Sequence, residues 1–162
     1  MASSGPRCVA ERKTVLYYHS MELNQFTDYS LRTLIVAALK NGDLTSVREV
    51  AASFSISENH LVKVVHKLSK LGYLETIRGR SGGIRLAKAP ESIPIGEVVR
   101  AVESFTLVDC MPPRTGECRI AGVCRLQGLL HRASAAFFRE LDSQTLADLV
   151  ANEVELRDRL GM

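Results

Sequence analysis

The sequence predicts a mainly α-helical fold with one small β-hairpin: a winged helix-turn-helix, followed by a long helix that we expect to form a dimer interface. Two amphipathic segments, 46–54 and 57–71, are separated by a two-residue link, as in a helix-turn-helix. A basic, glycine-rich hairpin follows directly over residues 73–88. The segment 124–141 then carries an apolar stripe at helical spacing, which calls for a second subunit to cover it.

The elements follow in order from local signals. Residues 21–40 have helical apolar spacing that Asn41-Gly42 ends. Ser46 and Glu49 have the spacing of a capping box at the start of the next helix. Ser57 is expected to cap the second helix of the motif, which Gly72 ends.

Three further helices are expected after the hairpin. One begins at Pro94 and runs to about Glu103, a long one begins at Cys124, and a short one covers residues 142–150. We therefore divide the chain into an N-terminal extension (1–20), a winged-helix DNA-binding domain (21–90) and a region with a cysteine loop and dimerisation helices (91–162). Residues 1–20 have no clear period, and Met21 is a candidate start of the protein.

Composition narrows the class of protein. Of 162 residues, 46% are hydrophobic and 24% charged, which is enough apolar material for a core and excludes a disordered chain. No apolar run approaches the length of a membrane span, and the first twenty residues carry charges where a signal peptide is apolar. We expect a cytoplasmic protein that has no membrane partner. No catalytic motif is recognisable, so we expect no enzyme.

The charge is unevenly distributed. The net charge is only +3, but residues 57–88 hold seven Lys or Arg against two acidic residues. Such a block on a winged helix favours contact with double-stranded DNA over an ordinary solvated face. The second helix of the motif would enter the major groove, and an arginine at the hairpin tip would reach the minor groove. The predicted DNA-contacting residues are Ser57, Asn59, His60, Lys63, Lys67, Arg78 and Arg80.

Three of the four cysteines lie within fifteen residues: Cys110, Cys118 and Cys124, with the spacing C-x7-C-x5-C. Thiolates suit Fe–S clusters, zinc or Cu(I), but structural zinc sites usually contain tight C-x2–4-C pairs, which this segment lacks. Wider loops with Pro and Gly favour a cluster, and Cys124 opens a helix whose dipole would stabilise its thiolate. A cluster commonly takes four protein ligands. The spacing leaves the fourth open among Cys8, Asp28, Asp109, Glu117 and His131.

Several segments together resemble the nitric-oxide-sensitive repressors among the Rrf-type winged-helix regulators of bacteria. They are "LNQFTDYSLRTLI", "SENHLVKVVHKLSKLGYLETIRGRSGGIRLAK", the motif "LVDC…C…CRL" and "LDSQTLADLV". The resemblance covers residues 21 to about 150, and the cysteine motif and the hairpin "RGRSGGIRL" are specific in combination.

The resemblance implies a homodimer that binds an inverted-repeat operator and holds an Fe–S cluster, [2Fe–2S] or [4Fe–4S], in each subunit. The three family cysteines match Cys110, Cys118 and Cys124, and the fourth ligand matches Asp28 of the other subunit. Nitric oxide would nitrosylate the cluster and release the DNA. The x7 spacing is longer than in several such repressors and also resembles relatives that sense iron, so a regulator of iron or cluster status is the alternative.

Arg32 is a candidate switch residue. It lies four residues after Asp28, at the spacing of an ion pair within a helix. We interpret Asp28 as binding either iron across the dimer or Arg32, with loss of the cluster changing its partner. Two other interpretations stay open: a ferredoxin-type electron carrier, which would need no basic winged helix, and a zinc-stabilised DNA-binding protein.

Overall fold

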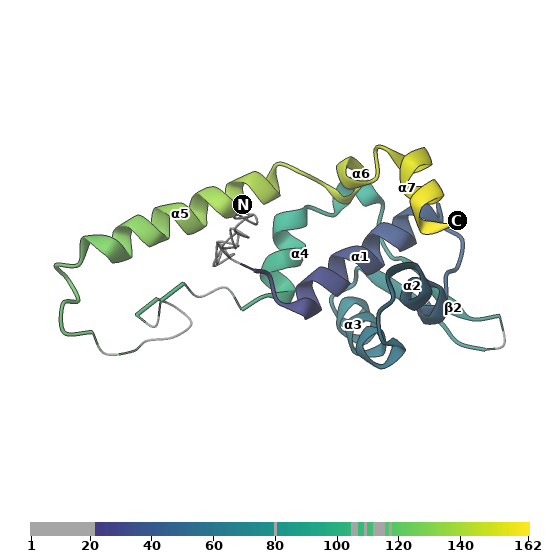
Figure 1. The fold of residues 1–162 in the computed structure, drawn as a ribbon, viewed down its shortest axis with the longest axis horizontal. Helices are drawn as coiled ribbons and strands as arrows, with labels where there is room; N and C mark the ends of the chain where they lie inside the picture. Colours follow the sequence, from purple (N-terminus) through teal and green to yellow (C-terminus); the bar gives the residue numbers. More distant parts are fainter. Residues whose placement is uncertain (1–21, 80, 105–106, 109, 112–115, 117) are drawn as a thin grey trace, which may run out of the picture.

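The computed structural model describes residues 22–79, 81–104, 107–108, 110–111, 116 and 118–162. It confirms the predicted class, since helices dominate and the two strands form one antiparallel hairpin (Figure 1). Residues 1–20 of the expected extension lie outside the described residues. The elements in chain order are α1 (Gln25–Leu39), α2 (Val47–Phe54), α3 (Glu58–Lys70), β1 (Leu74–Ile77), β2 (Gly83–Leu86), η1 (Pro90–Ser92), α4 (Ile95–Val102), α5 (Arg125–Asp142), α6 (Leu146–Leu149) and α7 (Glu153–Leu160).

The helix-turn-helix begins with the predicted capping box. The Ser46 hydroxyl accepts from the Glu49 amide at 3.1 Å, and the Ser46 amide donates to Glu49 Oε2 at 2.7 Å, which lowers the pKa of the Glu49 carboxyl. Ser55, in the left-handed region with φ of 54°, turns the chain sharply into α3. Ser57 occupies the N-cap of α3 as expected, but its side chain makes no capping hydrogen bond, so that part of the prediction was wrong.

The hairpin is attached to the start of α2. Leu74 lies opposite Leu86 and Ile77 opposite Gly83. Thr45 adds a single bridge to β2, because its amide donates to the Ile84 carbonyl at 2.9 Å and its carbonyl accepts from the Ile84 amide at 2.7 Å. A side chain at Gly83 would come within 2.6 Å of the Thr45 carbonyl oxygen, so only glycine allows this approach.

The core forms around α1. This helix packs against α2, α3, α4, α6 and β2, and eight of its fifteen residues are buried. Figure 1 shows α1 crossing the middle of the molecule with these elements around it. The fully buried side chains that surround it include Val50, Leu61, Val64, Leu68, Ile84, Val98, Val99 and Leu146.

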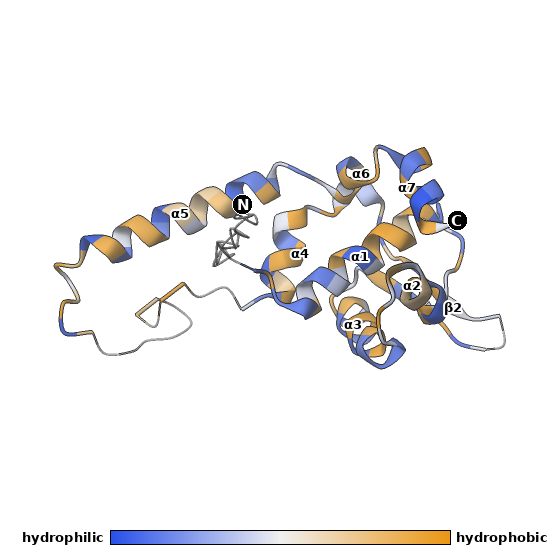
Figure 2. Ribbon diagram, in the orientation of Figure 1, coloured by the Kyte–Doolittle hydropathy of each residue, from blue (hydrophilic) through white to orange (hydrophobic). Residues whose placement is uncertain are grey.

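Helix α5 extends away from this body (Figure 1). None of its 18 residues is buried, and hydrophilic and hydrophobic residues alternate along it (Figure 2). Leu126 and Leu129 are 55% and 53% exposed. Its C-terminal end is fixed by Arg100 of α4, which donates to both carboxylate oxygens of Asp142 at 2.7 and 2.6 Å. Within the described ranges, no helix is long and apolar enough to cross a membrane.

The C-terminal helix α7 was not expected from the sequence, and the expected helix over 142–150 is reduced to α6. Arg157 of α7 donates to the Leu39 carbonyl at the end of α1 and to Glu153 at 2.7 Å. Asn41 donates to the same Glu153 carboxylate at 3.2 Å. A guanidinium therefore sits at the C-terminal end of α1, where the last turn has no basic residue of its own.

Candidate nucleic-acid interface and cysteine loop

Four of the residues predicted to contact DNA lie on the exposed side of α3. The buried residues Leu61, Val64 and Leu68 recur at helical spacing, so they form the core side of α3 and this face points away from the core. Arg78 follows β1 and is also exposed, whereas Arg80 lies outside the described residues. The predicted contacts that are exposed on or next to α3 are Ser57, Asn59, His60, Lys63 and Lys67.

A groove of about 520 Å³ separates α3 from the hairpin. It is lined by His66 and Val62 of α3, by Ser46 at the start of α2, and by Arg78. At one end the hydroxyls of Ser69 and Thr76 bond at 3.0 Å and join helix to hairpin. The acidic Glu75 of β1 is neutralised by Arg85 at 2.8 Å. The groove thus combines apolar walls with three hydroxyl groups and the Arg78 guanidinium, which could reach a phosphate backbone.

Val62 and His66 of α3 are not among the residues predicted to contact DNA. Both are exposed on the face that also carries Asn59. Helical spacing contained the signal, because these positions lie three and seven residues after Asn59. Val62 was missed because a valine in an amphipathic helix fits the core equally well.

The side chain of Tyr29 links α1 to the start of α3. Its ring is stacked on that of His60, with centroids 6.4 Å apart and planes 27° apart. The two rings border a small cavity of about 170 Å³ together with Phe26 and Lys63. A displacement of this end of α1 would therefore reach the first turns of the recognition helix directly.

The three cysteines lie in the segment between α4 and α5, all free and half-buried. The Cys110 carbonyl accepts from the Gln127 side chain at 3.2 Å, which holds the start of the loop to α5. The Cys118 carbonyl accepts from the Ala121 amide at 3.0 Å in a turn. Cys124 is the N-cap of α5, and its side chain makes no capping hydrogen bond. An 18-residue helix thus begins at a thiol that is available as a ligand.

Among the described residues, no three Cys, His, Asp or Glu side chains come together as a metal site. The donor set nevertheless fits an iron–sulfur group in its chemistry, because three free thiols on one loop are soft ligands of the required kind. Of the other candidate fourth ligands, Cys8, Asp109 and Glu117 lie outside the described residues, and His131 is exposed on α5.

Asp28 lies in the first turn of α1, with its carboxylate at the surface. Arg32 Nε donates to Asp28 Oδ1 at 2.9 Å, and the side chains of Asp28 and Arg32 are 42% and 41% exposed. The Arg32 guanidinium also lies 5.1 Å from the centre of the Phe54 ring in α2. The predicted pair therefore exists, and its arginine contacts the helix-turn-helix as well.

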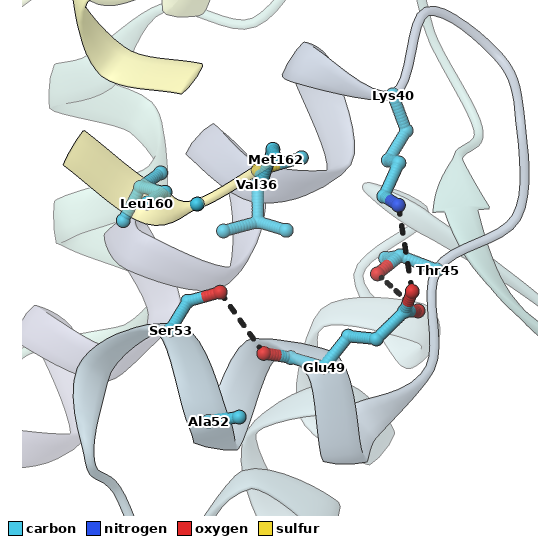
Figure 3. Close-up of a pocket in the computed structure, with 9 residues that line it drawn as sticks. Val36, Lys40, Thr45, Glu49, Ala52, Ser53, Leu160 and Met162 are labelled. Atoms are coloured by element: carbon cyan, nitrogen blue, oxygen red, sulfur yellow. Dashed lines mark hydrogen bonds and ion pairs between the residues drawn. The ribbon is translucent and has the colours of Figure 1, made fainter. Parts of the chain in front are cut away.

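A cavity of about 320 Å³ lies where the C-terminus meets α1 and α2 (Figure 3). Leu160 and Met162 line it together with Val36. Its charged groups already pair, since Glu49 accepts from Thr45 at 3.0 Å and lies 3.5 Å from Lys40. We interpret this cavity as a packing junction of α7.

The architecture and the exposed face of α3 define a DNA-binding protein of the winged-helix class. A family model described as "Rrf2: Iron-dependent Transcriptional regulator" matches residues 23–152. The HTH-type transcriptional regulator NsrR of Geobacillus kaustophilus is 51% identical over 142 residues, covering 86% of this chain and 97% of that protein. NsrR of Bacillus subtilis is 48% identical over 144 residues, covering 88% and 99%. The chain therefore belongs to the Rrf2 family of transcriptional regulators, and within it to the NsrR group.

A solved structure supports the fold. CymR, the global cysteine regulator of Bacillus subtilis, superposes with a TM-score of 0.67 at 27% identity and covers 82% of this chain and 98% of its own. The expectation of a DNA-binding regulator rather than an enzyme agrees with the names of these relatives.

Replacing Lys63 by Ala should weaken DNA binding, because the ammonium lies on the exposed face of α3 where it would neutralise a phosphate. The slope of log affinity against log salt should fall in magnitude by about 0.9 for each phosphate that is no longer neutralised, and a dimer would double that. Fluorescence anisotropy over a salt series measures the slope. Arg159→Ala on α7 also removes an exposed positive charge and serves as the control. Equal slopes for the two variants would contradict this placement of α3.

Proposed function

We propose that the chain is a homodimeric repressor that binds an inverted-repeat operator and releases it when nitric oxide reacts with an Fe–S cluster held by each subunit. One observation carries the proposal: three free, half-buried thiols occupy the loop before α5 in a chain of the NsrR group. The alternative is a regulator that responds to iron or cluster supply, which the "iron-dependent" description of the family favours.

The proposed ligands are Cys110, Cys118 and Cys124 of one subunit and Asp28 of the other. When bound, the cluster would supply iron that reacts with nitric oxide. The chain's own residues would shape that site: Cys124 ligates from the start of α5, and the Gln127 bond to the Cys110 carbonyl holds the loop close to that helix. Support for the cross-subunit ligand comes from the exposed position of Asp28 at the start of α1.

Asp28 could therefore have two alternative partners, the metal or Arg32. An exposed pair at this helical spacing contributes only about 0.3–0.5 kcal/mol, so a metal bond would outcompete it easily. Once the metal bond is lost, Asp28 would return to Arg32. Because Arg32 touches Phe54 of α2 and the neighbouring Tyr29 stacks on His60 of α3, this exchange would act on both helices of the DNA-binding motif.

The proposed dimer interface is α5. Helix α5 packs within its own chain at its C-terminal end, through Phe138 and Leu141, and none of its 18 residues is buried. Its exposed leucines, Leu126 and Leu129, would supply apolar area to a second copy. The same association would bring a second Asp28 and a second α3 into one particle, as both the ligand set and an inverted repeat require.

Nitric oxide should bleach the visible absorbance and release the operator in parallel. The protein is purified without oxygen and titrated with nitric oxide while absorbance and anisotropy are followed on a duplex that it selects from a random library. Cys118→Ala should lose both the absorbance and operator binding yet remain a folded dimer, whereas Arg119→Ala, its exposed neighbour, should retain them.

Other results of this titration would redirect the assignment. A cluster unaffected by nitric oxide, with DNA binding that follows iron supply, would establish the alternative regulator. Full cluster absorbance in Cys118→Ala would refute the ligand assignment, and a colourless zinc-loaded protein would refute the cluster.

Mixed dimers should identify which subunit supplies Asp28. A dimer of one Cys118→Ala chain and one Asp28→Ala chain, isolated through two different affinity tags, retains one complete site only if the aspartate acts across the interface. We expect it to hold one chelator-resistant cluster per dimer, measured by iron content and absorbance. Neither parent homodimer should hold one. A mixed dimer as unstable as its parents would place the aspartate within its own subunit or exclude it as a ligand.

Arg32→Ala should favour the state in which Asp28 binds the metal. Because Asp28 loses its alternative partner, cluster loss to a chelator should slow about twofold, in line with the small energy of such a pair. A larger fraction of operator should also stay bound after nitric oxide. Stopped-flow absorbance and anisotropy measure both, with Arg159→Ala as the control. If neither quantity changed, the proposed switch would be wrong.

A further inference from the structure

One apolar residue of the recognition helix faces solvent. Val62 is 55% exposed, although every other apolar side chain of α3 is buried. Those buried side chains are Leu61, Val64, Val65 and Leu68. These four side chains face the core, and Val62 does not add comparable buried apolar area to it.

Val62 lies beside the residues of α3 that are predicted to meet DNA. It is one helical turn after Asn59 and one turn before His66, and both of these polar residues are exposed like it. The side chain of Val62 also lines the groove between α3 and the hairpin, opposite Arg78. A ligand held by the cationic residues around the groove would therefore touch this valine.

We propose that Val62 reads the 5-methyl group of a thymine in each half of the operator. That methyl group is the one apolar group that base pairs present in the major groove, and apolar side chains are its usual partners. A β-branched side chain is stiff at χ1, so a valine loses little freedom when it makes the contact. Asn59 and His66 would flank it with hydrogen-bonding groups for the neighbouring base edges.

Charge favours DNA over a second protein as the occupant of this face. Lys63 and Lys67 lie on the same exposed surface and Arg78 borders the groove, whereas Glu58 is the acidic residue of α3. An apolar protein contact would place these cations beside a desolvated patch, which is costly. A duplex would place them beside phosphates instead.

Sequence selection tests the proposal on the cluster-loaded, full-length protein. A random duplex library is selected with the wild type, with Val62→Ala and with Val154→Ala. The control valine is 83% exposed on α7, outside the proposed interface. The wild type and Val154→Ala should share a consensus with one thymine per half-site that Val62→Ala no longer prefers.

A second measurement needs no protein variant. Each thymine of the selected duplex is replaced in turn by uracil, which lacks only the methyl group. At one position per half-site, uracil should weaken wild-type binding about fourfold, as expected for one methyl group left unburied. The same replacement should leave the affinity of the Val62→Ala variant for the duplex unchanged.

The outcomes separate clearly. If no uracil replacement weakened the wild type, or if Val62→Ala kept the wild-type consensus, the proposal would be overturned. A variant that fails to fold, seen by circular dichroism, leaves the uracil series on the wild type to decide. The inference rests on the winged-helix docking of α3 alone, so an insensitivity to nitric oxide would refute the proposed signal and leave the role of Val62 standing.

Discussion

The packing of α1 against its neighbours is the constraint on which the rest of the structure depends. This helix contacts α2, α3, α4, α6 and β2, and small buried side chains allow the close approach. Ser30 and Thr33 return their hydroxyls to the carbonyls of Phe26 and Tyr29, both at 2.7 Å, so they can be buried without unpaired groups. Because protein interiors are close-packed, α1 cannot shift at one end while α3 stays fixed.

A second fixed point lies where α5 leaves the body. Arg100 donates to both oxygens of Asp142, which lowers the pKa of that carboxyl and raises the pKa of the guanidinium, so the pair stays ionised. The same guanidinium lies 4.4 Å from the centre of the Phe138 ring. A side chain at Gly96 would meet the Asp142 carboxylate, so glycine is required for this arrangement. Helix α5 is therefore held at its C-terminal end, and its other end carries Cys124.

The sequence predicted most of the winged helix because local signals and burial agree there. The capping box of Ser46, the apolar spacing of α3 and the glycines of the hairpin all favour the observed elements. Helix α7 could not be predicted in this way, because its polar sequence has no apolar stripe. It is positioned by tertiary bonds from Arg157 to the end of α1.

The candidate site also contains residues that local sequence patterns could predict and residues that they could not. Helical periodicity placed the polar residues of α3 on one face, since a period of 3.6 residues is a local property. Periodicity also puts Val62 on this face, three residues after Asn59, but its apolar side chain made a place in the core equally plausible. The proposed fourth ligand, Asp28 of another chain, was equally beyond local reasoning. A residue that acts from another chain has no fixed spacing from Cys110, Cys118 and Cys124, and only the resemblance pointed to Asp28.

A ligand set divided between two chains would have a consequence that one confined to a single chain would lack. Three thiolates from one subunit could retain iron while the fourth ligand exchanges, so the signal need not dismantle the whole site. Asp28 would leave for Arg32, which is already within 2.9 Å. The dimer would persist, because its proposed interface on α5 involves neither Asp28 nor Arg32. The spacing of the two α3 helices would change instead, and binding to an inverted repeat with fixed half-site separation would be sensitive to that spacing.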